Sequence, residues 1–490
     1  MSMIAHGYGL AAYGSPYLVS SNVLWGYLVR AIPTINGVLG YSLATLAILV
    51  AIGWAAFYFL LRLGAGSLIG FLAVFLLVAQ PTLISQFTVN AGLLTVAAVL
   101  GWQVYARRGG TGSLVAACVL AFFGYLIRDK EFLLVLGVAL PLLPWRALRE
   151  RRRMRMAFLL LGLAIASAAV FDRWSYSGPE WRHFREFAPI RASIVDFSAG
   201  KYLRQDPQLI ARYGYSENDI RLIENWFFVD PQISAPNSLN AMLADLGPVP
   251  LQAGSMYAGF EGIKALAKPT VLPLFLTALL LLWLMPRWPV AISWTLCLAA
   301  LFAIGMMGRP GVLRIYVPIL GLLLVAPLAL EKHKKTILRW MVPLMLFVAS
   351  AGTAYMLAQD SWRFRQATQA VQNTLIGMPA GPIVSWANSF PFLLAFPVLA
   401  NDPNSRNIRL YGLDSFTLAP FSVAYTEQIA GRGMLKRLRT AEGTPIIALP
   451  KLMNMLSIYC NEHLNGRLRG FIAYRTPSFS VQQVRCEAGG

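Results

Sequence analysis

Long apolar runs separated by short polar connections fill the sequence from residue 40 to 171 and again from 269 to 358. A helix of about 20 residues crosses the hydrocarbon core of a bilayer, and shorter helices are tolerated within a bundle. The pattern predicts about ten membrane helices, of which those between Ser113 and Trp145 are short enough to be tilted, broken or partly re-entrant. The predicted helices are Gly40–Leu61, Ser67–Leu83, Phe87–Ala106, Ser113–Ile127, Phe132–Trp145, Ala157–Phe171, Pro269–Met285, Trp288–Met307, Leu313–Leu330 and Leu338–Ala358.

Three segments lie outside these runs: an amphipathic stretch at 1–39, a large loop at 172–268 and a tail at 359–490. The loop is too long for a simple connection, and its pattern is helical. Ser216 and Asp219 have the spacing of a capping box ahead of the amphipathic run Ile220–Phe228. In the tail, strand-like runs alternate with a helical pattern over Lys451–Leu464, which predicts a small α/β domain.

The predicted fold class is therefore mainly α: a polytopic membrane helix bundle with six helices over 40–171 and four over 269–358, a helical outer loop and a C-terminal α/β domain. Composition agrees, because 57% of residues are hydrophobic and only 13% are charged, against about 25% charged residues in soluble domains. In a soluble protein, a net charge of +20 would suggest binding to nucleic acid. Here the basic residues cluster at the ends of apolar runs, which indicates membrane topology and no nucleic-acid partner.

Basic residues in the short connections alternate between a rich set and a poor set. The rich set is Arg62, Arg107, Arg108, Arg146, Arg149, Arg151, Arg152, Arg153, Arg155, Arg287, Lys332, Lys334, Lys335 and Arg339; the poor set is Arg128, Lys130, Arg309 and Arg314. The positive-inside rule places the rich set in the cytoplasm. The three segments outside the bundle are then expected on the periplasmic or extracellular side of the inner (plasma) membrane.

An N-terminus on that side, without a signal peptide, suggests that Met1 is internal to a longer reading frame. Translocation of the short N-terminal tail is the alternative.

Two cysteines, Cys460 and Cys486, fall in the tail, and an oxidising compartment would permit a disulfide between them. The four histidines are scattered, and there are no paired-cysteine spacings, phosphate-cradling lysine loops or dinucleotide-binding glycine patterns. We therefore expect no metal and no cofactor.

The candidate chemistry lies where helices meet the outer surface. Arg128 and Lys130, beside Asp129 and Glu131, form one outer turn, and Arg309 and Arg314 flank another. Guanidinium groups hold phosphate oxygens in a bidentate fork, so these four cations are candidates for binding a lipid-linked phosphate. Ordinary snorkelling and mutual ion pairing is the alternative.

At the start of the large loop, charged residues alternate with aromatic ones. A solvated helix face explains such a pattern. The alternative is a binding site for an anionic carbohydrate or lipid head group, for which Arg182, His183 and Arg185 are the candidates.

These features together resemble the GT-C class of polyprenyl-phosphate-sugar-dependent glycosyltransferases. The stretch from Tyr13 to Tyr41, YGSPYLVSSNVLWGYLVRAIPTINGVLGY, is similar to the segment after the first outer-loop acidic motif in bacterial members. The resemblance implies transfer of a sugar from a polyprenyl-phosphate donor to a cell-envelope glycan or glycolipid on the outer face.

One departure concerns the catalytic base. The class carries an acidic residue or pair in its first outer loop, whereas residues 1–39 contain no Asp or Glu. Because a sugar hydroxyl needs a positioned base, another outer-face carboxylate would have to serve, and Asp129, Asp172 and Glu180 are the candidates. Otherwise the acidic motif lies upstream of Met1, or the chain is not an active transferase. Two other functions stay open: a non-catalytic export, flippase or assembly component, and a polysaccharide polymerase or ligase in which His183 acts.

Overall fold

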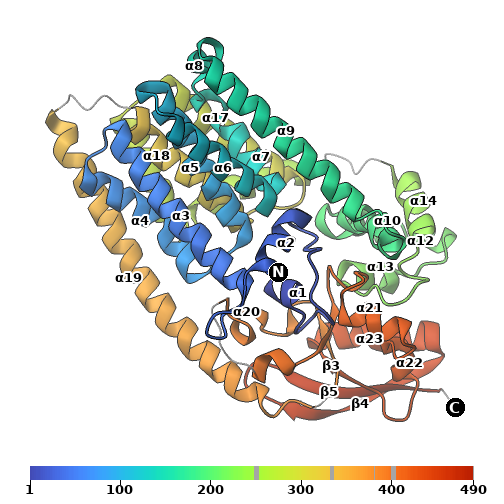
Figure 1. The fold of residues 1–490 in the computed structure, drawn as a ribbon. Helices are drawn as coiled ribbons and strands as arrows, with labels where there is room; N and C mark the ends of the chain where they lie inside the picture. The colour runs from blue at the N-terminus through green and yellow to red at the C-terminus, as the bar shows by residue number, and fades with distance from the viewer. Residues whose placement is uncertain (248–252, 331–335, 380, 399–403, 489–490) are drawn as a thin grey trace.

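The computed structural model describes residues 1–490 except 248–252, 331–335, 380, 399–403 and 489–490. It consists of a helix bundle and a second layer packed against one end of that bundle (Figure 1). The second layer combines the large loop and the C-terminal sheet. The predicted fold class is confirmed.

The bundle contains helices at all ten predicted runs. Its helices are α3 (Gly40–Leu63), α4 (Ser67–Leu83), α5 (Phe87–Arg108), α6 (Thr111–Ile127), α7 (Asp129–Ala139), α8 (Trp145–Glu150), α9 (Arg152–Ser175), α16 (Leu272–Leu284), α17 (Trp288–Met306), α18 (Leu313–Leu330) and α19 (Thr336–Leu375). Within the described residues, six of them, α3, α5, α9, α17, α18 and α19, are long and apolar enough to span a membrane alone. The helices α4 and α6 are shorter but apolar. The run predicted over Phe132–Trp145 is broken, because α7 ends at Ala139 and a 3₁₀ turn follows at Leu140–Leu142.

The centre of the bundle is formed by α5 and α18, whose most apolar windows are 94% and 78% buried. Small residues on α5 permit this close packing: a Cβ at Gly92 would lie 2.3 Å from Pro318 of α18. By contrast α9 and α19 run along opposite outer edges (Figure 1), and each has only 17% of its window buried. Their apolar outer surfaces are consistent with lipid contact.

The large loop folds into short helices that follow α9. They are α10 (Arg182–Arg191), a π turn (Ala192–Asp196), α11 (Ala199–Leu203), α12 (Pro207–Arg212), α13 (Glu217–Glu224), α14 (Pro236–Leu246) and α15 (Ala253–Lys264). The capping box predicted at α13 is confirmed. The Ser216 side chain accepts a hydrogen bond from the Asp219 N–H, and the Asp219 side chain accepts one from the Ser216 N–H. The last helix, α15, meets α16 at an angle of 89°.

The C-terminal domain is a five-stranded sheet of order β2-β1-β3-β5-β4. Its strands are β1 (Ile383–Trp386), β2 (Leu410–Leu413), β3 (Thr444–Ile447), β4 (Gly466–Arg475) and β5 (Ser480–Ala488), with helices α20 (Phe392–Ala395), α21 (Val423–Ile429), α22 (Met434–Leu438) and α23 (Pro450–Leu464). The strands β2, β1 and β3 are parallel, whereas β5 is antiparallel to both β3 and β4. A disulfide joins Cys460 of α23 to Cys486 of β5.

The large loop and the C-terminal domain share one hydrophobic core. Phe227 of the loop packs on Trp386 and Tyr459, with ring centroids 5.4 and 5.0 Å apart. The Trp386 indole donates a hydrogen bond of 2.6 Å to the Asn225 carbonyl. These contacts hold two segments that are distant in sequence as one layer.

The N-terminal segment, with α1 (Ser2–His6) and α2 (Val23–Ala31), lies between this layer and the bundle (Figure 1). Its backbone extends the C-terminal domain: the Gly9 N–H donates to Ile408, and the Leu410 N–H donates to Gly9.

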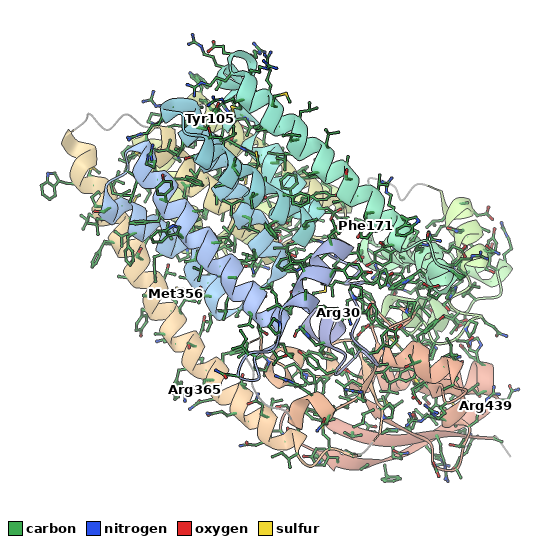
Figure 2. All side chains as sticks on the ribbon, in the orientation of Figure 1. Arg30, Tyr105, Phe171, Met356, Arg365 and Arg439 are labelled. Carbon is green, nitrogen blue, oxygen red and sulfur yellow. A yellow bond between two sulfur atoms is a disulfide. The ribbon has the colours of Figure 1, made fainter. Side chains whose placement is uncertain are left out.

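All three extramembrane segments therefore lie at the end of the bundle opposite α8. Figure 2 marks the two ends, with Tyr105 near α8 and Arg30 at the other end. From the basic set, Lys332, Lys334, Lys335 and the side chain of Arg339 lie outside the described residues.

Candidate functional site

The first part of the candidate site is the turn between α6 and α7. Arg128 follows the last residue of α6 and precedes α7, and its guanidinium donates a 2.8 Å hydrogen bond to the Ser20 carbonyl. The same guanidinium carbon lies 5.8 Å from the centre of the Phe87 ring. The turn thus contacts both the N-terminal segment and α5, which fixes the direction of the Arg128 side chain.

The second part is the turn between α17 and α18, which carries Arg309 and Arg314. Arg309 donates a 3.0 Å hydrogen bond to Asp196 at the end of the π turn in the large loop, and Arg191 lies 3.9 Å from the other Asp196 oxygen. Gly308 permits this docking: its φ is +86°, and a Cβ there would lie 2.6 Å from the Ser198 hydroxyl. A side chain at position 308 would therefore be strained by this backbone conformation and would displace the Ser198 hydroxyl.

Four guanidinium groups are brought together by these contacts, and we call them the arginine cluster: Arg128, Arg191, Arg309 and Arg314. Arg309 and Arg314 lie close enough to Arg128 for their positive charges to repel its guanidinium. Arg309 is likewise close enough to repel Arg191. The Lys268 ammonium also approaches, because it lies 3.0 Å from the position that a Cβ on Gly311 would take. Such a concentration of positive charge favours binding of an anion with several oxygen atoms.

A buried carboxyl group lies beside the arginine cluster. Glu131 is only 3% exposed, and its Oε1 atom has no hydrogen-bond partner in the described part of the chain. The charges of Arg128 and Arg314 both act on it. An unpaired buried charge is costly, so an ionised Glu131 would depend on these two nearby cations. The sequence showed Glu131 as a member of the turn but did not show that its side chain is buried.

A second carboxylate approaches from the C-terminal domain. Asp414 follows β2, and its Oδ1 atom accepts a 2.6 Å hydrogen bond from the Phe416 N–H. Burial raises the pKa of the Asp414 carboxyl to about 6, although that hydrogen bond and the charge of Arg191 act in the opposite direction. Sequence reasoning missed Asp414 because no nearby motif marks it; only the docking of the domain on the large loop brings it close to Arg191.

A cavity of about 140 Å³ opens on the other side of the Asp414 turn. Its lining includes Phe228 and His183 from the large loop and Thr417, Tyr425 and Gln428 from the C-terminal domain. Thr417 accepts a 2.8 Å hydrogen bond from the Asp414 N–H, so one turn borders the arginine cluster and the cavity. Burial lowers the pKa of His183, which favours the neutral imidazole. Aromatic faces with amide and hydroxyl groups are suitable for a sugar-sized polar ligand.

The other residues predicted from sequence lie apart from this cavity. Lys130 and Asp129 are exposed on the first turn of α7, and Arg182 and Arg185 are exposed on α10. Asp172 accepts a 2.7 Å hydrogen bond from the Val23 N–H, so it caps the start of α2. Glu180 is exposed and lies near Tyr13 and Tyr17 of the N-terminal segment. None of these placements tests a catalytic role.

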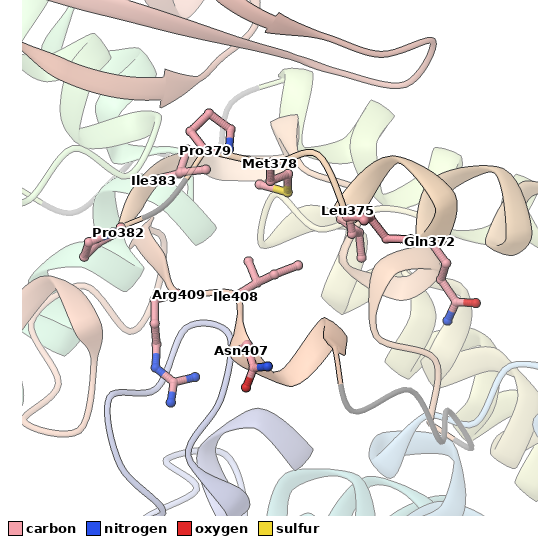
Figure 3. Close-up of a pocket in the computed structure, with 11 residues that line it drawn as sticks. Gln372, Leu375, Met378, Pro379, Pro382, Ile383, Asn407, Ile408 and Arg409 are labelled. Carbon is pink, nitrogen blue, oxygen red and sulfur yellow. The ribbon is translucent and has the colours of Figure 1, made fainter.

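Another cavity, of about 430 Å³, lies where α19 ends and β1 begins (Figure 3). Leu375, Met378 and Ile408 form an apolar wall, while Asn407 and Arg409 point together toward one side (Figure 3). Among the described residues that line it there is no carboxylate. It therefore lacks the base that transfer to a hydroxyl group requires.

A group of polar side chains joins α13 to α23. The His463 imidazole lies 2.8 Å from Asp219, and the Ser216 hydroxyl donates a 2.9 Å hydrogen bond to Glu462. The two carboxylates and the imidazole could each offer one ligand atom to a metal ion, and these three atoms lie within 4.8 Å of one another. Since Asp219 and Glu462 already accept hydrogen bonds that join the loop to the domain, we interpret the group as a structural contact.

Comparison with known proteins gives a limited picture. No protein-family model matches the chain, and no curated protein matches it. Among solved structures, the chain is similar to ArnT from Cupriavidus metallidurans bound to undecaprenyl phosphate, with 12% sequence identity and a TM-score of 0.40. That similarity covers 100% of this chain and 92% of ArnT.

Proposed function

We propose that this chain is a membrane glycosyltransferase that transfers a sugar from a polyprenyl-phosphate donor to a glycan or lipid of the cell envelope. The observation that carries the proposal is the arginine cluster, in which four guanidinium groups from three segments converge at one end of the membrane bundle. A lipid-linked phosphate could keep its chain in the bilayer while its head group reaches this cluster. The extramembrane layer would then lie on the outer face, as the distribution of basic loops predicts.

The arginine cluster would serve the leaving group. In the reaction the acceptor hydroxyl oxygen forms a bond to the anomeric carbon while the bond from that carbon to the phosphate oxygen breaks. The electron pair of the broken bond stays on the polyprenyl phosphate. Guanidinium groups already in position stabilise that developing charge without reorganisation at the moment of reaction.

Asp414 is the base that the geometry favours. It lies next to Arg191 of the arginine cluster and on the turn that lines the cavity with His183. In its ionised form it could take the proton of an acceptor hydroxyl held in that cavity. A carboxylate whose pKa of about 6 is close to neutral pH is suited to this work. Asp129, at the turn beside Arg128, remains the alternative predicted from sequence.

The acceptor is proposed to bind in the cavity of about 140 Å³. His183 was predicted from sequence as an acceptor-binding residue, and its place in the cavity wall supports that role. Tyr425 and Gln428 would supply further hydrogen bonds from the opposite wall. Arg182 and Arg185, on the exposed face of α10, would contact a more distant part of an anionic acceptor.

The test is binding and turnover with the purified full chain. Arg309→Ala and Arg128→Ala should each weaken binding of polyprenyl phosphate by roughly 10-fold to 150-fold, because a lost charge-assisted contact costs about 1.5 to 3 kcal/mol. Arg62→Ala is the matched control, since Arg62 lies on α3 and contacts Tyr58 rather than the cluster.

Two results would decide between functions. Unchanged binding in both cluster variants would remove the reason for placing phosphate there. Binding that depends on the cluster, without transfer from any polyprenyl-phosphate sugar, would favour the non-catalytic export or assembly function.

A further inference from the structure

A large apolar groove lies on the hairpin of α16 and α17, at the end of the bundle opposite the arginine cluster. It has a volume of about 1140 Å³, and its wall includes Leu279, Leu280, Trp283 and Trp288. The two tryptophans are 73% and 83% exposed. Tryptophan is enriched where membrane helices meet the interfacial region, because one part of the ring is apolar and its N–H is polar. The groove thus lies at the level of lipid head groups.

The turn of the hairpin places a positive charge at the end of this groove. Arg287 lines it between Trp283 and Trp288, and its charge acts on Arg107 at the end of α5. Arg287 and Arg107 thus bring two positive charges to this end of the groove. The neighbouring α8 and the start of α9 add further arginines at this end of the bundle (Figure 1), so the field favours negative head groups over neutral ones.

We propose that this groove is a binding site for an anionic diacyl phospholipid of the bilayer. One acyl chain lies along Leu279, Leu280 and Trp283, and the phosphate group is bound by Arg287. The site is separate from the arginine cluster, which lies at the other end of the bundle. Basic pockets at the cytoplasmic ends of membrane helices are suited to such lipids, because apolar contact supplies affinity and charge selects the head group.

The experiment is native mass spectrometry of the full chain in detergent, titrated with phosphatidylglycerol or with phosphatidylcholine of the same acyl chains. The parent should bind phosphatidylglycerol more tightly. Arg287→Gln should reduce that binding by about tenfold and remove the preference between the two lipids. Arg62→Gln is the matched control, because Arg62 ends the span of α3 in the same predicted basic set, contacts Tyr58 and does not line the groove.

A second variant tests the groove itself. Ala291→Phe should fill the wall and weaken binding of both lipids while leaving the melting temperature in detergent close to that of the parent. Equal binding of the two lipids by the parent, or full phosphatidylglycerol binding by Arg287→Gln, would overturn the proposal. Cross-linking of two chains through Trp283→Cys in place of lipid binding would also overturn it, because the groove would then be an interface between copies.

Discussion

Arg309 donates a hydrogen bond of 3.0 Å to Asp196, which lies 113 residues earlier in the chain. This contact joins the turn between α17 and α18 to the large loop, and it uses a guanidinium that we propose for phosphate binding. A carboxylate and a phosphate would therefore compete for Arg309. In the ligand-free protein, Asp196 keeps this positively charged group paired.

Removing the competing carboxylate should strengthen phosphate binding. Asp196→Asn is expected to lower the Kd for polyprenyl phosphate by up to about fivefold, because a partly exposed ion pair contributes about 0 to 1 kcal/mol and its loss frees the charge of Arg309. The Kd would be measured with a fluorescent polyprenyl phosphate. Glu224→Gln serves as the control, because Glu224 pairs with Arg204 elsewhere in the same loop. Weaker binding by Asp196→Asn would show that Asp196 positions Arg309 rather than competing for it.

The raised pKa of Asp414 predicts the acidic limb of the pH profile. A general base works only when ionised, so kcat/KM for transfer should fall as the pH decreases through about 6, the pKa of Asp414, and should be level above it. Asp414→Asn should reduce kcat by roughly 100-fold to 10,000-fold and abolish that limb.

The control for this variant is Asp245→Asn, because Asp245 is exposed and bonded to Tyr213. If Asp414→Asn keeps full activity and the same profile, Asp129→Asn and Asp172→Asn become the variants to measure.

The proposed orientation can be tested by labelling. In a Cys118→Ser background, cysteines introduced at the exposed positions Lys201 and Arg475 should react with a membrane-impermeant maleimide in intact cells, whereas one at the exposed position Arg152 should not. The reason is the excess of basic residues at the α8 end of the bundle. Labelling at Arg152 but not at Lys201 would reverse the orientation and move the arginine cluster to the cytoplasmic face.

The disulfide should stabilise the C-terminal domain. Cys460 and Cys486 are separated by 26 positions, and closing a loop of that size in the unfolded chain is worth about 3 kcal/mol. Replacing both cysteines with serine should therefore lower the temperature at which the domain becomes sensitive to protease in the full chain. Cys297→Ser, within α17, is the comparison that leaves the domain unchanged. Equal protease sensitivity of parent and double variant would contradict the prediction.

The sequence predicted the helices well because lipid imposes a strong rule: a spanning segment must satisfy its own backbone and present apolar side chains. The positions of Arg128 and Arg309 at the ends of helices follow from the same rule. The strand-like runs of the tail were also visible, since β-branched and aromatic residues alternate there.

The composition of the site was harder to predict. Asp196 and Asp414 come from different extramembrane segments, and neither has a local pattern that distinguishes it from a surface carboxylate. Asp414 lies near Arg191 because Phe227 and Trp386 pack the large loop on the sheet, and Asp196 meets Arg309 because the loop docks on the turn between α17 and α18. Contacts of this kind depend on tertiary packing, which no short-range spacing encodes. Asp172 is a further example, because it accepts a hydrogen bond from the Val23 N–H, 149 residues earlier in the chain.

The length of α19 has a mechanical consequence. The helix is continuous over 40 residues, or about 60 Å at 1.5 Å per residue, whereas the hydrocarbon core is about 30 Å thick. It begins at the α8 end of the bundle and reaches the start of the sheet, so it acts as a stiff rod between the bilayer and the C-terminal domain (Figure 1). A thinner bilayer would tilt such a rod and shift its far end sideways. We therefore expect the position of the sheet relative to the membrane helices to depend on membrane thickness.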